Sequence, residues 1–67
     1  MKLARARYTD GGLWRVVNPS AVIDKPPIGT IVQYERDVND WYYVYFPGIL
    51  GYASMPGSMF NWYFESL

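Results

Sequence analysis

The sequence predicts a small all-β domain in which residues 1–67 form one barrel of five to six short antiparallel strands. Six glycines and five prolines divide the chain into short segments, and both residue types are typical of the turns between strands. No segment has the apolar spacing of a helix over three turns. Aromatic residues make up 19% of the chain, and their large side chains can fill the core of so short a domain.

Turn signals set the expected boundaries of the strands. The first strong signal is the Asp-Gly-Gly sequence at residues 10–12, because glycine adopts positive φ without steric cost. Runs of β-branched and aromatic residues predict strands at residues 13–17, 30–35, 41–46 and 51–54. Residues 18–29 include two adjacent prolines and are expected to form a loop, with Val22 and Ile23 pointing inward. A last aromatic run occupies residues 59–64.

Charge is unevenly distributed, although the net charge is zero. Residues 1–36 contain all six basic residues and three acids, whereas residues 37–67 contain three acids and no base. The basic N-terminal part is either a solvated edge strand protected by Lys and Arg, or a basic edge that binds nucleic acid or an acidic partner. We favour the edge strand.

Several classes of function lack the residues that they need. The chain has no cysteine and no histidine, which excludes disulfides, zinc–thiolate sites and acid–base catalysis by histidine. Asp37 and Asp40 flank a turn, where aspartate ordinarily accepts hydrogen bonds from backbone amides. We therefore expect no enzymatic activity and no cofactor. There is no apolar run of about 18 residues and no signal peptide, so we expect a cytoplasmic protein without a membrane span.

Four short motifs follow one another in the middle of the chain: GTIV at residues 29–32, NDWYYV at 39–44, PG at 47–48 and GYA at 51–53. In this order and spacing they resemble the bacterial SH3-like (SH3b) family, whose pattern is GT-x-V, a turn into W-x-x-V, a glycine turn and GY-V. Val17 stands where the family has an arginine, and Ala53 where it has a larger aliphatic residue. The resemblance implies an SH3-like barrel that binds peptides through an aromatic groove. The family's cell-wall role is not expected without an export signal.

The strand expected at residues 41–46 carries the main candidate binding residues, because side chains alternate between the two faces of a strand. The inward set is Tyr42, Val44 and Phe46. The outward set is Trp41, Tyr43 and Tyr45. Contiguous exposed rings are typical of interaction surfaces. The family resemblance adds neighbours of the tryptophan, so that the complete predicted partner-binding set is Tyr8, Trp41, Tyr43, Tyr45, Tyr52 and Phe60.

A second arrangement of the aromatic residues stays open. The tail, with Trp62 and Phe64, can fold over the outward face of residues 41–45 and turn that face into a second small core. Trp14 lies just inside a strand after a glycine turn, and we expect it to be structural.

These observations predict a module that binds a protein or a peptide. The short chain, which starts at Met and lacks export features, suits a phage or mobile-element protein that binds and modulates a host protein. One alternative is a nucleic-acid-binding barrel, in which bases stack on the outward rings and phosphates contact Arg5, Arg7 and Arg15. The small number of basic residues argues against it. The other alternative is an assembly subunit that forms homo-oligomers through its aromatic face.

Overall fold

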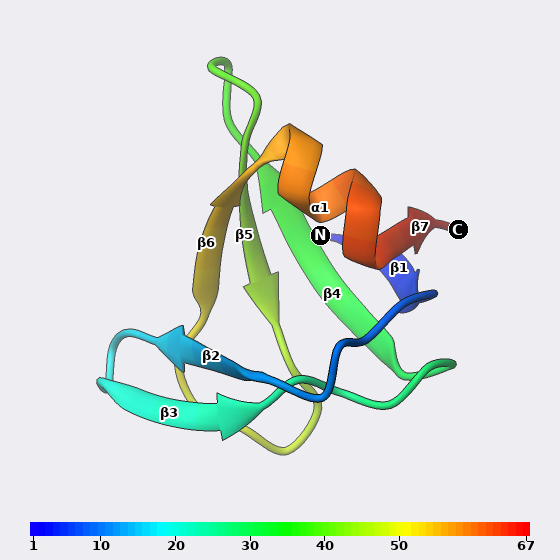
Figure 1. Cartoon of the computed structure of the whole chain (residues 1–67). Coiled ribbons are helices and arrows are strands. Elements are labelled where there is room, and N and C mark those ends of the chain that lie inside the picture. The colour runs from blue at the N-terminus through cyan, green and yellow to red at the C-terminus, as the bar shows by residue number, and fades with distance from the viewer.

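Seven short strands and one helix follow one another in the computed structural model, which describes residues 1–67 (Figure 1). The elements are β1 (Lys2–Ala6), β2 (Leu13–Val16), β3 (Ala21–Asp24), β4 (Ile31–Arg36), β5 (Trp41–Tyr45), β6 (Ala53–Pro56), α1 (Gly57–Tyr63) and β7 (Phe64–Ser66). The helix has seven residues, and the chain forms no helix of the length and apolarity needed to cross a membrane.

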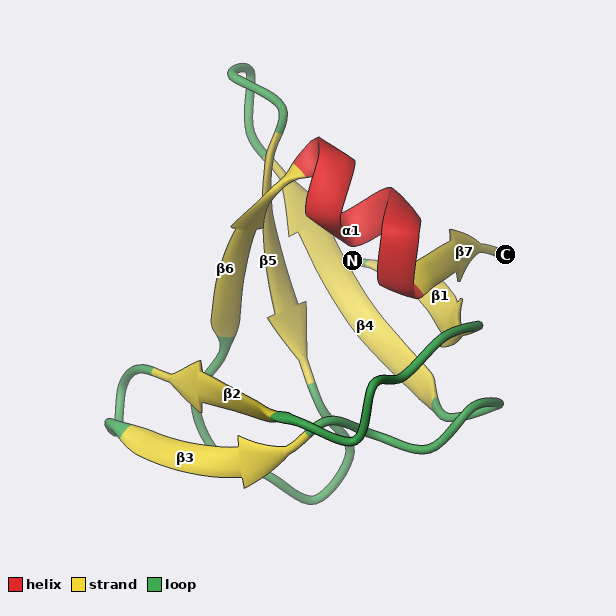
Figure 2. Cartoon of the chain, viewed as in Figure 1, coloured by secondary structure: helices red, strands yellow, loops and turns green.

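Five of the strands form one curled antiparallel sheet in the order β6-β5-β4-β1-β7 (Figure 1). The hairpin of β2 and β3 forms a second sheet, and the pairing of Val17 with Tyr52 connects it to the start of β6. The helix lies across the concave side of the large sheet (Figure 2). This arrangement is the small SH3-like barrel of short antiparallel strands that the sequence predicts, with seven strands where five to six were expected.

The core fills the space between the concave face of the sheet, the hairpin and the helix. Its largest fully buried side chains come from the helix, the sheet and the hairpin. They are Phe60, Phe64, Met55, Val16, Val32 and Val44. No buried polar side chain is left without a hydrogen-bond partner, so the core gains from apolar burial without a desolvation penalty.

The basic N-terminal segment is not an edge strand, which corrects the reading that we favoured. Strand β1 lies between β4 and β7 inside the large sheet. Ala4 and Ala6 are fully buried, and their small side chains let the concave face close over them. Arg5 points to the other face, where its guanidinium forms an ion pair with Glu65 at 2.6 Å. The alternation of small and charged residues in β1 therefore fits a central strand.

The expected loop at residues 18–29 contains strand β3. Only one of the two residues that were expected to point inward does so: Ile23 packs against the core, whereas Val22 is 54% exposed. The strand alternates faces as any strand does, so the expectation that both residues point inward is wrong. The prolines at residues 26–27 come after the strand has ended and do not interrupt it.

Most of the aromatic tail belongs to helix α1, whose seven residues make only about two turns and are too short to show helical apolar spacing over three turns. Phe60 and Phe64 are four residues apart and both point into the core. Their ring centroids are 5.3 Å apart. Phe60 lies within α1, whereas Phe64 has extended backbone and begins β7, so the helix and the strand after it each contribute one ring to the core.

Candidate binding site

Strand β5 divides its side chains between the two faces of the sheet as predicted. Val44 is fully buried and Phe46, just after the strand, is nearly so. Tyr42 packs against the same core. Trp41, Tyr43 and Tyr45 point to the convex outer face.

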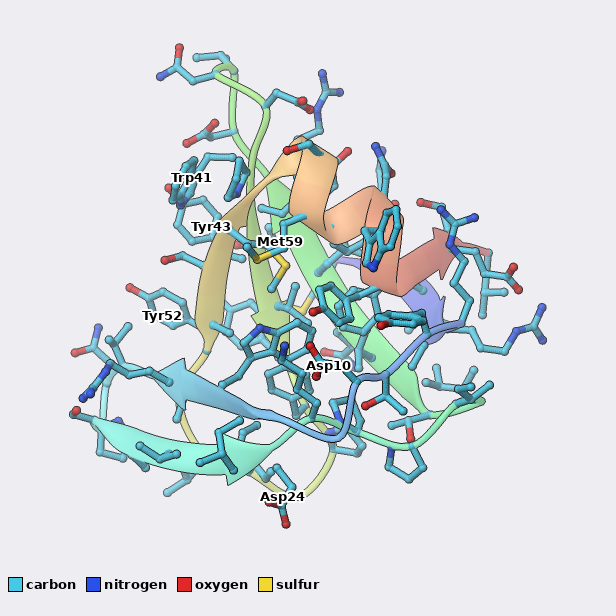
Figure 3. All side chains as sticks on the ribbon, viewed as in Figure 1. Asp10, Asp24, Trp41, Tyr43, Tyr52 and Met59 are labelled. Carbon is cyan, nitrogen blue, oxygen red and sulfur yellow. The ribbon has the colours of Figure 1, made fainter.

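The outward residues of β5 are joined by Tyr52 from the start of the neighbouring strand. The ring centroid of Tyr52 lies 5.8 Å from that of Tyr43 and 5.7 Å from that of Tyr45. Trp41 is 39% exposed, and the three tyrosines are half-buried. Figure 3 shows Trp41, Tyr43 and Tyr52 in a row on the side of β5 and β6 that faces away from α1. We call these four residues, Trp41, Tyr43, Tyr45 and Tyr52, the aromatic face.

Asp37 holds two members of the aromatic face in position. Its Oδ1 accepts hydrogen bonds from the backbone N–H groups of Asn39, at 2.8 Å, and Trp41, at 3.0 Å. Its Oδ2 accepts a bond of 3.0 Å from the Tyr43 hydroxyl. The backbone bonds confirm the turn role expected of Asp37. The bond to Tyr43 was missed, because it crosses the hairpin.

These hydrogen bonds also set the ionisation of the two groups. The pKa of Asp37 lies below its usual value, and the hydrogen bond from the Trp41 N–H is the largest cause. The hydrogen bonds from the Asn39 N–H and the Tyr43 hydroxyl lower this pKa further. The same Asp37–Tyr43 bond is the main cause of the raised pKa of Tyr43. At neutral pH the carboxylate is therefore charged and the phenol is protonated, which is the pairing that the hydrogen bond requires.

Glu35 brings a second negative charge to the edge of the aromatic face. It stands directly opposite Tyr43 in the pairing of β4 with β5, and Gln33 stands opposite Tyr45. The pKa of Tyr45 is raised, mainly by burial and further by the negative charge of Glu35. None of the three ion pairs of the protein includes Glu35. The outer sides of β4, β5 and β6 carry no lysine or arginine.

The outer apolar surface continues from Tyr45 across the sheet towards β1. A shallow cavity of about 240 Å³ lies there. Its lining includes Leu3, Ile31 and Gln33 beside Tyr45. Leu3 and Ile31 are both exposed, so a partner that covers the aromatic face can extend over this cavity.

Two of the predicted partner-binding residues lie elsewhere in the structure. Phe60 is wrong as a surface residue: its exposed fraction is 0%, and its ring stacks on Tyr42 with centroids 4.1 Å apart. Phe60 points inward because it lies on the face of α1 that packs against the core. Tyr8 is exposed, but its ring packs against Trp62 and Tyr63 at the end of α1. It is not part of the aromatic face.

The tail does not cover the aromatic face, so the second arrangement considered from the sequence is wrong. Phe64 packs inside the barrel, with its ring centroid 5.5 Å from that of Trp14. Trp62 is 64% exposed and lies on α1, where its ring packs against Tyr8 and not against the aromatic face. Trp14 also contacts Phe46 and Tyr63, which confirms its structural role.

No cluster of three acidic side chains is placed to hold a metal ion. Comparison with family models, curated proteins and solved structures finds no match to this chain. The likeness to SH3b domains therefore stays a resemblance of motifs, and the argument for function depends on the geometry of the aromatic face.

Proposed function

We propose that the protein is a non-catalytic module that binds another protein or a peptide through the aromatic face. The observation that carries the proposal is the set of four aromatic side chains on one open face of the sheet. Such side chains expose apolar area to water that polar residues would not, and they become favourable when a partner covers them. Tryptophan and tyrosine are also the residue types that contribute most to protein interfaces.

The side chains of the aromatic face are held in fixed positions, which supports the same proposal. Asp37 anchors the backbone of Trp41 and the hydroxyl of Tyr43, and Tyr52 packs against Tyr43 and Tyr45. Rings that are held in place before binding lose little conformational entropy when the partner arrives. This favours a binding surface over rings that are exposed by chance.

Nucleic acid is a weaker candidate partner for this face. Two of the arginines considered for phosphates are engaged elsewhere, Arg5 with Glu65 and Arg7 with the backbone carbonyl of Asn61. The charge beside the rings is that of Glu35, which repels phosphate. Since affinity for nucleic acid depends largely on neutralising phosphates, the aromatic face is poorly suited to it.

The test uses peptides selected from a random display library against the wild-type protein. We expect Trp41→Ala to weaken the selected peptides about 30-fold, which corresponds to a loss of about 2 kcal/mol for a central interface tryptophan. The matched control is Trp62→Ala, because Trp62 is more exposed than Trp41 and lies on another side of the molecule. This control should bind like the wild type, as measured by calorimetry.

Two results would contradict the proposal. One is a selection that yields no specific peptide, or peptides that tolerate Trp41→Ala as well as Trp62→Ala. The other is a wild-type protein that self-associates with rising concentration and becomes monomeric on Trp41→Ala. That result would assign the aromatic face to a homo-oligomer contact.

A further inference from the structure

We propose that the aromatic face receives a positively charged side chain of the partner, an arginine or a lysine, held over its tyrosine rings beside the carboxylate of Glu35. This inference rests on the proposed function and specifies the chemistry of the partner at that site. It follows from the arrangement of the rings and from the charge around them.

The three tyrosine rings lie close together and are inclined at different angles. Tyr52 stands edge-on to Tyr43, with 71° between the ring planes, and is tilted by 47° from Tyr45. Both centroid separations from Tyr52 to these two rings are below 6 Å, and Tyr52 comes directly before β6, the neighbour of β5. A cation within about 6 Å of a ring centroid is attracted by the negative face of the ring. Rings this close together let one cation contact more than one of them.

Two acidic side chains lie beside the rings. Glu35 lies opposite Tyr43 on β4, and Asp37 accepts a hydrogen bond from the Tyr43 hydroxyl at the same end of the strand. Two basic residues are near: Lys2 and Arg36 line a cavity with Glu35, and the charge of Arg36 contributes to the lowered pKa of Asp37. Neither of them forms an ion pair with Glu35, so the Glu35 carboxylate is open to a cation of the partner.

This charge distribution separates the possible occupants. A phosphate or an acidic side chain would be repelled by Glu35. A purely apolar side chain would cover the rings but would also desolvate an unpaired carboxylate, which is costly. A cationic side chain satisfies both groups, because its charge pairs with Glu35 while its apolar stem or flat guanidinium lies on the rings.

The experiment compares two small probes of nearly the same shape, N-acetylarginine amide and its uncharged analogue N-acetylcitrulline amide. Each is titrated into isotopically labelled protein, and the ring resonances of Tyr43, Tyr45 and Tyr52 are followed by NMR. We expect the arginine probe to shift these resonances and to bind about two- to fivefold more tightly than the citrulline probe, the scale of a cation–π contact at an exposed site.

Two variants test whether the charge of Glu35 contributes to the preference for the arginine probe. Glu35→Gln should lower the affinity for the arginine probe and leave that for the citrulline probe unchanged, so that the preference for arginine becomes smaller. The matched control, Asp24→Asn, removes the same charge from the end of β3, away from the aromatic face (Figure 3), and should leave the preference for arginine unchanged. Backbone spectra of both variants verify the fold.

The inference is overturned if both probes bind equally, if neither shifts the three rings, or if Asp24→Asn lowers the arginine affinity as much as Glu35→Gln. Its failure is distinct from failure of the proposed function. Suppose that library peptides depend on Trp41 but bind unchanged when their arginines are replaced by citrulline. This result would support the proposed peptide-binding function and contradict only the inference that the partner supplies a cation.

Discussion

Asp10 shows how one carboxylate joins distant parts of this barrel. Its Oδ1 accepts a hydrogen bond of 2.9 Å from the backbone N–H of Gly12. Its Oδ2 accepts bonds from the Lys25 ammonium, at 3.0 Å, and from the Tyr63 hydroxyl, at 2.9 Å. The same ammonium lies 4.4 Å from the ring centroid of Tyr63 and 5.2 Å from that of Trp14. The cluster therefore ties the turn before β2 to the end of β3 and the end of α1.

The pKa of Asp10 leads to a prediction about acid stability. The N–H of Gly12, followed by Lys25 and Tyr63, lowers the pKa of Asp10 from 3.8 to about 2 in the folded protein. As the pH falls, the unfolded chain therefore takes up this proton first. The stabilisation by Asp10 is present in full above pH 3.8 and is lost as the pH falls towards 2.

We expect Asp10→Asn to be less stable than the wild type at pH 7, and the difference to shrink as the pH approaches 2. Urea unfolding of both proteins at pH 7, 4, 3 and 2 measures it. A difference in unfolding midpoint that stays constant over this range would show that the charge of Asp10 is not what stabilises the cluster.

Among the elements, β5 combines two tasks in five residues. One face contributes Val44 to the core, and the other contributes the outward rings to the aromatic face. The alternation of side chains in a strand makes this division possible without a loop or an insertion. As a result, the aromatic face is supported directly by the core.

Helix α1 contributes one fully buried side chain to the core. Phe60 is fully buried and contacts rings from β4, β5 and β7, namely Tyr34, Tyr42 and Phe64. We expect Phe60→Ala to lower the free energy of unfolding by about 3 to 5 kcal/mol, the usual cost of truncating a buried phenylalanine. That loss is a large part of the total free energy of unfolding of a domain of this size. Chemical denaturation measures the effect.

Met59 provides the matched control for this prediction. It lies on the same helix but is 41% exposed (Figure 3), so Met59→Ala should change the stability by no more than about 0.5 kcal/mol. Equal losses for the two variants would mean that the helix contributes through its backbone rather than through Phe60.

At the scale of the whole molecule, the two sheets differ in how firmly they are held. Strands β1, β4 and β5 each have a neighbour on both sides, whereas the β2–β3 hairpin has only two strands. Outside its own pairing, the hairpin is connected to the large sheet by the reciprocal hydrogen bonds of Val17 with Tyr52. Few backbone bonds therefore have to open to release it.

We predict that amide hydrogen exchange separates the two sheets. Amides of β1, β4 and β5 should exchange most slowly, and those of the hairpin faster, because a region with fewer connections opens at a lower free energy. The Lys25 amide, which bonds to the carbonyl of Gly12, reports on the hairpin, and the Ala6 amide, which bonds to that of Thr30, reports on β1. Equal protection of the two amides would show that the barrel opens only as a unit.

The sequence by itself determined the features that depend on neighbouring residues. The alternation along residues 41–46 predicted which rings face outward, and the acids next to turns predicted the backbone bonds of Asp37. Both follow from the geometry of a strand or a turn over a few residues. The all-β class followed in the same way from the spacing of turns and aromatic runs.

Only the tertiary structure decided where the aromatic residues at the two ends of the chain would lie. Phe60 and Trp62 are both aromatic residues of one tail, yet one is fully buried and the other mostly exposed, because a two-turn helix turns one side chain inward. The position of β1 between β4 and β7 brings together residues about 60 positions apart, such as Arg5 and Glu65. Such contacts depend on how the whole chain closes its core, and no local pattern encodes them.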